Sequence, residues 1–342
     1  MRELRISVFA VLMTFALLIC GCSKASSPSG GGGTSGSPGA GGSGGSGSLG
    51  TGSGASMADA SVDRNITASI DAIEYASLDG PTGCGLAGAP TGTLNNQTII
   101  VGGQARTYLL SVPRNYDPNT PLPLVFGWHA HGATGALARQ LFSLEPAAAG
   151  GAVFVYPDGL GTAGNTDWDY AETGLDVQLF DLLLNTLTST YCIDRNRIFS
   201  TGMSAGAFFT NLLGCVRGQV LRAIAPASGG PPGSADPSPV VCAGNVGAWI
   251  AHASNDDTVD FKAYGIATRD FWIARNGCST TLAPVDASPV ECVEYQGCQP
   301  DLPVVWCVHS EGHIWPSLAN CLDGGVCFDA GPAVWAFFAR FH

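Results

Sequence analysis

Hydrophobic and polar positions follow two patterns through most of the chain. Short unbroken apolar runs, such as Leu122 to Trp128 and Ala152 to Tyr156, are typical of strands covered on both faces of a sheet. Longer stretches, such as Leu175 to Tyr191, place leucines at helical spacing. The same patterns predict strands at Arg197 to Thr201, Ala223 to Pro226, Ala248 to Ala251 and Val304 to Val308, and helices at Leu137 to Ala149, Ser204 to Val216, Lys262 to Arg275 and Ala333 to Phe341. Because strands and helices alternate, we expect an α/β fold with a mostly parallel, doubly wound sheet flanked by helices.

The segment before this alternation has a different pattern. Ile99 to Val101 and Arg106 to Val112 are β-branched and apolar, and Gly102-Gly103 lies between them. A two-glycine loop suits a tight hairpin turn. The sequence therefore predicts two paired edge strands ahead of the alternating part.

The first 22 residues are typical of a bacterial export signal. Two arginines precede an apolar run from Ile6 to Ile19, which is shorter than the roughly 20 residues that span a membrane. The run ends in LICGC, which resembles a lipobox and implies cleavage before Cys22 and lipidation of its thiol. We expect a lipoprotein signal peptide at 1–22, a Gly/Ser-rich flexible tether with an N-terminal extension at 23–83, and a catalytic domain at 84–342.

The number of cysteines indicates the compartment of the protein, and the net charge limits the kinds of partner. Removing Cys20 with the signal and Cys22 to the lipid leaves ten of the 12 cysteines, an even number that favours disulfides in an exported protein. Paired CxxC spacing of the zinc type is absent from the sequence, and no metal is expected. The net charge of −12 argues against a nucleic-acid partner.

The strongest chemical signal is the pentapeptide Gly202 to Gly206, GMSAG. A second GxSxG match centres on Ser43, but glycine is so frequent in the tether that chance explains it. Ser204 instead lies between a predicted strand and a predicted helix, the context in which this motif presents a nucleophilic serine. Flanking glycines permit a sharp turn, and the helix N-terminus offers N–H groups to a developing negative charge. The alternative is a tight turn without catalysis.

A serine nucleophile needs a histidine base and an acid, which follow it in the order Ser, Asp or Glu, His in α/β-hydrolases. His313 lies in the loop SEGHIWP after the strand that contains His309, where such a base is expected. His252 and His342 are expected to be structural or incidental. A surface-loop role is the alternative for His313.

The acid is expected in the loop SNDDTVD, which follows the strand Ala248 to Ala251. The pattern leaves Asp256 and Asp257 nearly equal, since either carboxylate could hold the imidazole. Asp260 is expected to cap the helix that begins near Phe261.

An oxyanion hole needs two N–H donors. One is expected from Ala205, directly after the nucleophile, and the other from the loop His129-Ala130-His131-Gly132 after an earlier strand. The two histidines of this loop could equally hydrogen-bond the turn.

Four segments, PLVFGWHAHG, YCIDRNRIFSTGMSAG, HASNDDTVD and GHIWP, together resemble the secreted polyhydroxybutyrate depolymerase, feruloyl esterase and acetylxylan esterase group of carbohydrate esterase family one. The resemblance spans about residues 84 to 342 and implies an α/β-hydrolase fold. It assigns the acid to Asp256 and the base to His313, and it suggests that Trp315 lines the substrate site, with a buried core position as the equal alternative. The group usually has His-Gly where this chain has His129-Ala130, so we favour the His131 N–H as second donor, with Ala130 as the alternative.

These features predict a serine carboxylic-ester hydrolase that needs no cofactor and acts by acyl transfer. Its expected partners are a polymeric or small ester, with the N-terminal lipid as the only membrane contact, and it is expected to be a monomer at the cell surface or outside the cell. The expected substrates are feruloyl or acetyl esters of plant polysaccharide, or polyhydroxybutyrate. The alternatives are a general small-ester carboxylesterase, a peptidase, and a non-catalytic polysaccharide-binding lipoprotein.

Overall fold

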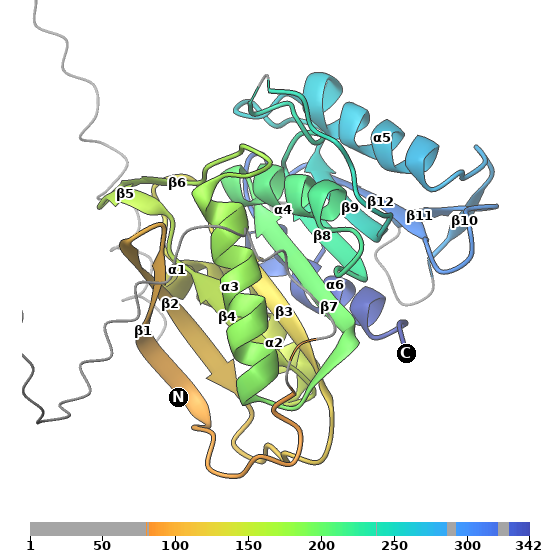
Figure 1. Cartoon of the computed structure of the whole chain (residues 1–342). Helices are drawn as coiled ribbons and strands as arrows, with labels where there is room; N and C mark the ends of the chain where they lie inside the picture. Colours follow the sequence, from red (N-terminus) through yellow and green to blue (C-terminus); the bar gives the residue numbers. More distant parts are fainter. Residues whose placement is uncertain (1–79, 81, 237, 286–291, 321–327) are drawn as a thin grey trace, which may run out of the picture. The chain divides into compact units, whose positions relative to one another are not determined.

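The computed structural model describes residues 80, 82–236, 238–285, 292–320 and 328–342, and its centre is a ten-stranded sheet (Figure 1). The order across the sheet is β1-β2-β4-β3-β7-β8-β9-β12-β11-β10. The six strands from β4 to β12 pair in parallel, and the two strands at each edge pair antiparallel. The strands are β1 (Gly92–Val101), β2 (Gln104–Val112), β3 (Leu122–Trp128), β4 (Val153–Pro157), β7 (Ile193–Met203), β8 (Ala223–Ala227), β9 (Gly247–Ala253), β10 (Leu282–Pro284), β11 (Cys292–Tyr295) and β12 (Val304–His309). The predicted mostly parallel sheet is therefore confirmed.

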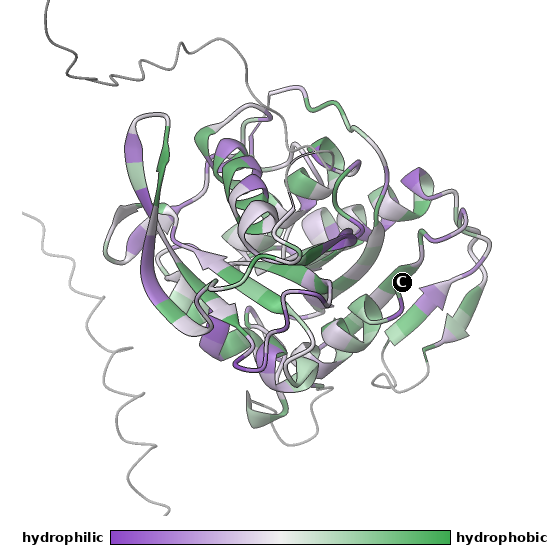
Figure 2. Cartoon of the chain, turned by 60° about the horizontal axis from the view of Figure 1, so that its bottom comes forward, coloured by the Kyte–Doolittle hydropathy of each residue, from purple (hydrophilic) through white to green (hydrophobic). Residues whose placement is uncertain are grey.

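Two hydrophobic cores cover the two faces of the sheet. Along β3, Leu124, Phe126 and Trp128 belong to one core, whereas Val125 belongs to the other, as the alternation of side chains in a strand requires. The first core packs under α3 (Leu175–Thr190), α4 (Ala205–Val216) and α5 (Ala267–Arg275), and the second under α1 (Gly135–Phe142), α2 (Leu144–Ala148) and α6 (Ala330–Phe338). Figure 2 shows the hydrophobic residues along the central strands. Burial on both faces explains why these strands are unbroken apolar runs.

One predicted helix is two helices in the structure. The expected helix at 137–149 is broken at Ser143, which has a left-handed backbone with φ 52° and separates α1 from α2. Pro146 supplies the physical reason, because it has no N–H for the carbonyl of Phe142 and its ring would clash with that carbonyl in a continuous helix.

The last two predicted helices also differ from the structure. The expected helix at 262–275 consists of a π-helix, η1 (Phe261–Ile266), followed by α5. The predicted cap is confirmed, because the Asp260 carboxylate accepts a hydrogen bond from the N–H of Ala263 at 2.6 Å. The helix predicted at 333–341 begins three residues earlier, at Ala330, since Pro332 is tolerated in the first turn of a helix.

Edge strands were partly predicted. The hairpin with Gly102-Gly103 at its turn is confirmed, although β1 starts at Gly92, seven residues before the predicted strand. The short hairpin β5 (Leu160–Thr162) and β6 (Asn165–Asp167) was not predicted, nor were β10 and β11. A 3₁₀ turn, η2 (Leu318–Asn320), follows the His313 loop.

Within the described residues, four disulfides join eight cysteines. They are Cys84–Cys192, Cys215–Cys242, Cys278–Cys298 and Cys292–Cys307. Disulfides of this number indicate an oxidising compartment. Cys321 and Cys327 lie outside the described residues. Residues 1–79, which include the signal peptide, Cys22 and most of the tether, also lie outside them, so the lipid anchor stays a prediction. None of the helices in the described ranges has the length and hydrophobicity needed to span a membrane.

We expect the Cys84–Cys192 disulfide to contribute most to stability, because it joins residues 108 apart and constrains the unfolded chain most strongly. Replacing both cysteines with alanine should lower the free energy of unfolding by about 4–5 kcal/mol, whereas removing a link across roughly 15 residues should cost about 3 kcal/mol. The matched control is therefore the Cys292→Ala, Cys307→Ala pair, which removes the disulfide with the separation of 15 residues. Urea unfolding of both variants checks the ranking, and a larger loss in the control would contradict it.

Candidate active site

The sequence-predicted catalytic residues lie in loops at one edge of the sheet. Ser204 follows β7, Asp256 follows β9 and His313 follows β12, and these strands are parallel members of the consecutive run β7-β8-β9-β12. The loop with His131 follows β3, which pairs with β7. Since the carboxyl ends of parallel strands meet at one edge, these four loops form the usual site position of an open α/β sheet.

Ser204 occupies a strained turn between β7 and α4. Its backbone has φ 55° and ψ −121°, a conformation that residues with side chains rarely adopt. A Cβ atom on Gly202 would lie 2.3 Å from the carbonyl oxygen of Gly206, and one on Gly206 would lie 2.0 Å from that of Trp128. Only glycine therefore fits at these two positions, and the turn packs directly against the end of β3.

Ser204, His313 and Asp256 form one line of hydrogen bonds. The Nε2 of His313 lies 2.8 Å from the Ser204 Oγ, and the Nδ1 lies 2.8 Å from Oδ2 and 3.0 Å from Oδ1 of Asp256. A carboxylate only accepts, so Nδ1 carries the proton and Nε2 is free to accept the hydroxyl proton. The order and spacing are those of a nucleophile, a base and an orienting acid.

The structure separates the two candidate acids. Asp256 has a side chain with 0% exposure and also accepts from the N–H groups of Thr258 and Val259, at 3.0 and 2.8 Å. Burial acts to raise its pKa, but the hydrogen bonds from His313, Val259 and Thr258 outweigh it, so the pKa lies below the usual value. Asp257 is exposed and accepts from the Thr258 hydroxyl. Asp256 is thus the carboxylate that contacts the imidazole.

Hydrogen bonds of the buried His129 hold the loop after β3 in place. The His129 ring accepts from the N–H of Gly159 at Nε2, at 2.8 Å, and donates through Nδ1–H to the carbonyl of Ala130, at 2.7 Å. Trp168 donates its indole N–H to the carbonyl of His129 at 2.9 Å. His129 therefore bonds the turn, which was one of the two expected roles for the histidines of this loop.

The predicted oxyanion donors belong to the start of α4 and to the loop after β3. Ala205 is the first residue of α4, where helix N–H groups have no partner within the helix. In the described part of the loop, the N–H groups of Gly132 and Ala133 bond carbonyls, whereas those of Ala130 and His131 have no acceptor. Both Ala130 and His131 thus remain possible second donors, and the choice of His131 stays a prediction. Its ring points to the Asp167 carboxylate, 3.0 Å away.

Trp315, two residues after His313, is largely buried. Its side chain is 4% exposed and stacks on Phe142 of α1, with ring centroids 4.3 Å apart. Both residues belong to the second hydrophobic core. The structure therefore shows that Trp315 packs in this core, and its contact with substrate stays a prediction.

Sequence reasoning missed the segment Asp167 to Tyr170. The Tyr170 hydroxyl donates to Asp167 Oδ1 at 2.9 Å and lies 3.3 Å from the carbonyl of Ala205, next to the nucleophile. The same aspartate contacts His131 through Oδ2. Alternating acidic and aromatic residues in DWDY were the available signal, but only the fold brings them to the turn after Ser204.

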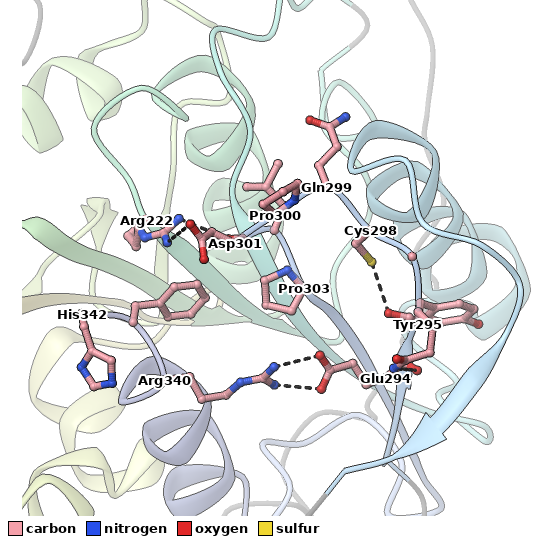
Figure 3. A pocket seen from close by; sticks show the side chains of 14 residues that line it. Arg222, Glu294, Tyr295, Cys298, Gln299, Pro300, Asp301, Pro303, Arg340 and His342 are labelled. Atoms are coloured by element: carbon pink, nitrogen blue, oxygen red, sulfur yellow. Dashed lines mark hydrogen bonds and ion pairs between the residues drawn. The ribbon is translucent and has the colours of Figure 1, made fainter.

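A separate cavity of about 460 Å³ lies at the other end of the parallel strands (Figure 3). Its lining includes Arg222, directly before β8, and Pro303, directly before β12, so it lies at the amino ends of the strands. Arg340 pairs with Glu294 at 2.8 Å. This cavity is therefore distinct from the site around Ser204.

Comparisons with known proteins show the family and the fold of the chain. No protein-family model matches the sequence. Feruloyl esterase D of Neurospora crassa is 33% identical over 286 residues, which cover 76% of this chain and 90% of that protein. Feruloyl esterase C of Emericella nidulans is 30% identical over 259 residues, covering 72% and 87%. A poly(3-hydroxybutyrate) depolymerase of Ralstonia pickettii is 28% identical over 160 residues, 42% of this chain and 32% of that protein.

Among solved structures, the acetyl xylan esterase from Aspergillus awamori matches with a TM-score of 0.55 and 16% identity, over 71% of this chain and 98% of that one. At this identity the match bears on the fold, and the predicted α/β-hydrolase fold is confirmed.

Proposed function

Since this chain belongs to the feruloyl esterase family, we propose that it hydrolyses hydroxycinnamoyl esters of plant polysaccharide by a Ser-His-Asp mechanism outside the cell. The observation that carries the proposal is the line of hydrogen bonds from Ser204 Oγ through His313 to Asp256. The coarser activity, a carboxylic-ester hydrolase, is that of the family.

The first step forms an acyl-enzyme. The Ser204 Oγ attacks the ester carbonyl carbon while His313 Nε2 takes the hydroxyl proton, and the Asp256 carboxylate stabilises the imidazolium. The negative oxygen of the tetrahedral species binds N–H groups of Ala205 and of the loop after β3. His313 then gives the proton to the leaving alkoxide, the C–O bond breaks, and the alcohol departs.

The second step releases the acid. Water loses a proton to His313 Nε2 as its oxygen attacks the acyl carbon, and the same donors bind the oxyanion. Collapse returns the proton to Ser204 Oγ and frees the carboxylic acid. No oxidant, metal or cofactor enters the balance of this reaction.

An aromatic acyl group is supported by a row of partly exposed rings near Ser204. Tyr170 and Phe208 have centroids 6.5 Å apart, and Phe208 and Tyr264 have centroids 5.5 Å apart. Phe208 lies one turn after Ser204 on α4, and helical side chains lean toward the N-terminus of their helix. A flat acyl group could therefore contact these rings by aromatic packing.

A panel of substrates tests the proposal. The purified protein is incubated with methyl ferulate, acetylated xylan, polyhydroxybutyrate film and a peptide, and the released acids or amines are measured. We expect the highest kcat/KM on methyl ferulate. Turnover of the film but not of methyl ferulate would instead identify a depolymerase, and cleavage of the peptide alone would identify a peptidase.

A further inference from the structure

His252 is a second histidine beside the Asp256 carboxylate that contacts His313. It is in β9 and has 0% exposure, and its Nε2 lies 2.8 Å from the carbonyl oxygen of Val259 and 3.5 Å from Asp256 Oδ2. Both neighbours are acceptors, so Nε2 carries a proton and donates it to Val259. The same N–H also lies near Asp256 Oδ2, the carboxylate oxygen that the His313 Nδ1–H contacts at 2.8 Å.

His252 and Asp256 both form hydrogen bonds with the backbone of Val259. Val259 donates its N–H to Asp256 Oδ1 at 2.8 Å and accepts from His252 through its carbonyl. The turn from Asp256 to Val259 is therefore tied to the carboxylate through the N–H of Val259 and to β9 through its carbonyl. Without the imidazole, the carbonyl of Val259 would lose its donor, and the turn that sets the carboxylate angle would loosen.

The π-helix η1 holds the imidazole in this position. Gly265 of η1 packs on the ring so closely that a Cβ there would lie 2.7 Å from the His252 Cγ. The ring of Phe261, also in η1, approaches it edge-on at 5.9 Å. π-Helical turns are frequent at functional sites, and here the turn places a glycine where no side chain would fit.

We propose that His252 is a positioning residue, which holds the Asp256 carboxylate at the angle that receives the His313 Nδ1–H. This inference rests on the proposed Ser-His-Asp mechanism. It assigns a role to a histidine that the sequence indicates only as structural or incidental, and that does not reach Ser204.

The charged and titratable groups around His252 are Asp256, Asp260, His309 and His313. Burial lowers the pKa of His252, and burial together with His252 lowers the pKa of His309 to about 4. Both are therefore neutral at neutral pH. Three imidazoles thus lie near one carboxylate, and the two buried ones remain uncharged when His313 accepts the proton of Ser204.

Two variants that differ by one methylene test the role. His252→Gln can place an amide N–H where Nε2 lies, whereas the shorter side chain of His252→Asn cannot reach that position. We expect His252→Asn to lower kcat on methyl ferulate by roughly 10- to 100-fold with KM unchanged, as misplacement of a catalytic group by about 1 Å can do. His252→Gln should retain most of the wild-type kcat, and thermal unfolding should show that both variants fold.

Two further readouts separate positioning from packing. The acidic limb of the kcat/KM profile reports the base of the free enzyme, and it should move to lower pH in His252→Asn only, because a misaligned carboxylate stabilises the His313 imidazolium less. The proton NMR signal of the His313 Nδ1–H should move upfield in that variant and stay in place in His252→Gln.

Wild-type kcat and an unmoved NMR signal in a folded His252→Asn variant would overturn the proposal, as would equal losses in both variants with the signal unmoved. The NMR comparison needs no turnover. If the wild-type protein hydrolysed no ester, the proposed function would fail while the positioning of Asp256 could still be judged.

Discussion

Replacing Ser204 with alanine is expected to lower kcat on methyl ferulate by roughly a million-fold, the loss typical of removing a triad nucleophile. The variant keeps the turn and the oxyanion donors, but it has no oxygen to form the acyl-enzyme. The loss should therefore be in kcat, with the protein as stable as the wild type or more so. Steady-state kinetics measure the loss of kcat, and labelling with a fluorophosphonate probe measures the loss of the nucleophilic oxygen.

The sequence supplies a matched control for this experiment. Ser43 lies in the second GxSxG match, within the glycine-rich tether. Ser43→Ala is expected to retain wild-type kcat and probe labelling. Full activity in Ser204→Ala, or loss of activity in Ser43→Ala, would show that the nucleophile has been misassigned.

Replacing Asp256 with asparagine should lower kcat by about ten-thousand-fold, because the amide can donate to Nδ1 and favour the wrong imidazole tautomer. The side chains have nearly the same shape, so the fold should be retained. Kinetics on methyl ferulate above the pKa of the base measure the effect.

The neighbouring Asp257→Asn is the control, since that carboxylate is exposed and accepts a hydrogen bond from the Thr258 hydroxyl rather than from the base. Little change is expected in its kcat. If the two substitutions had equal effects, the loop would work through its overall charge rather than through the contact of Asp256 with His313.

The central strands could be predicted because burial on both faces leaves a plain signal. Leu122 to Trp128 is a continuous apolar run, and the structure has β3 at those residues. The break at Ser143 was harder, since the hydrophobic spacing continues across it and only Pro146 opposes a helix. Strands β5, β6 and β10 are short and largely exposed, so they carry no periodic pattern.

A site residue could be predicted when the sequence next to it was enough to identify it. Ser204 was identified by its own turn, whereas Asp256 and Asp257 are adjacent and their different directions are set by the hydrogen bonds of Val259 and Thr258. The family resemblance chose the correct neighbour of the imidazole. The packing of Trp315 was less local, because it depends on the distant Phe142.

Disulfide pairing was similarly non-local. Ten cysteines allow very many pairings, and the partner of Cys84 lies 108 residues away. Only the packing of the segment before β1 against the end of α3 brings the two together, because Gly83 donates its N–H to the carbonyl of Thr188.

At Ser204, stability and activity make opposite demands on one residue. A non-glycine residue at φ 55° and ψ −121° costs about 1–3 kcal/mol, and the surrounding packing must impose it. Glycine would relieve that strain at position 204 but would remove the hydroxyl. Selection for stability alone would therefore favour glycine at position 204, whereas selection for activity favours serine. The chain has serine at this position, so activity decided the residue.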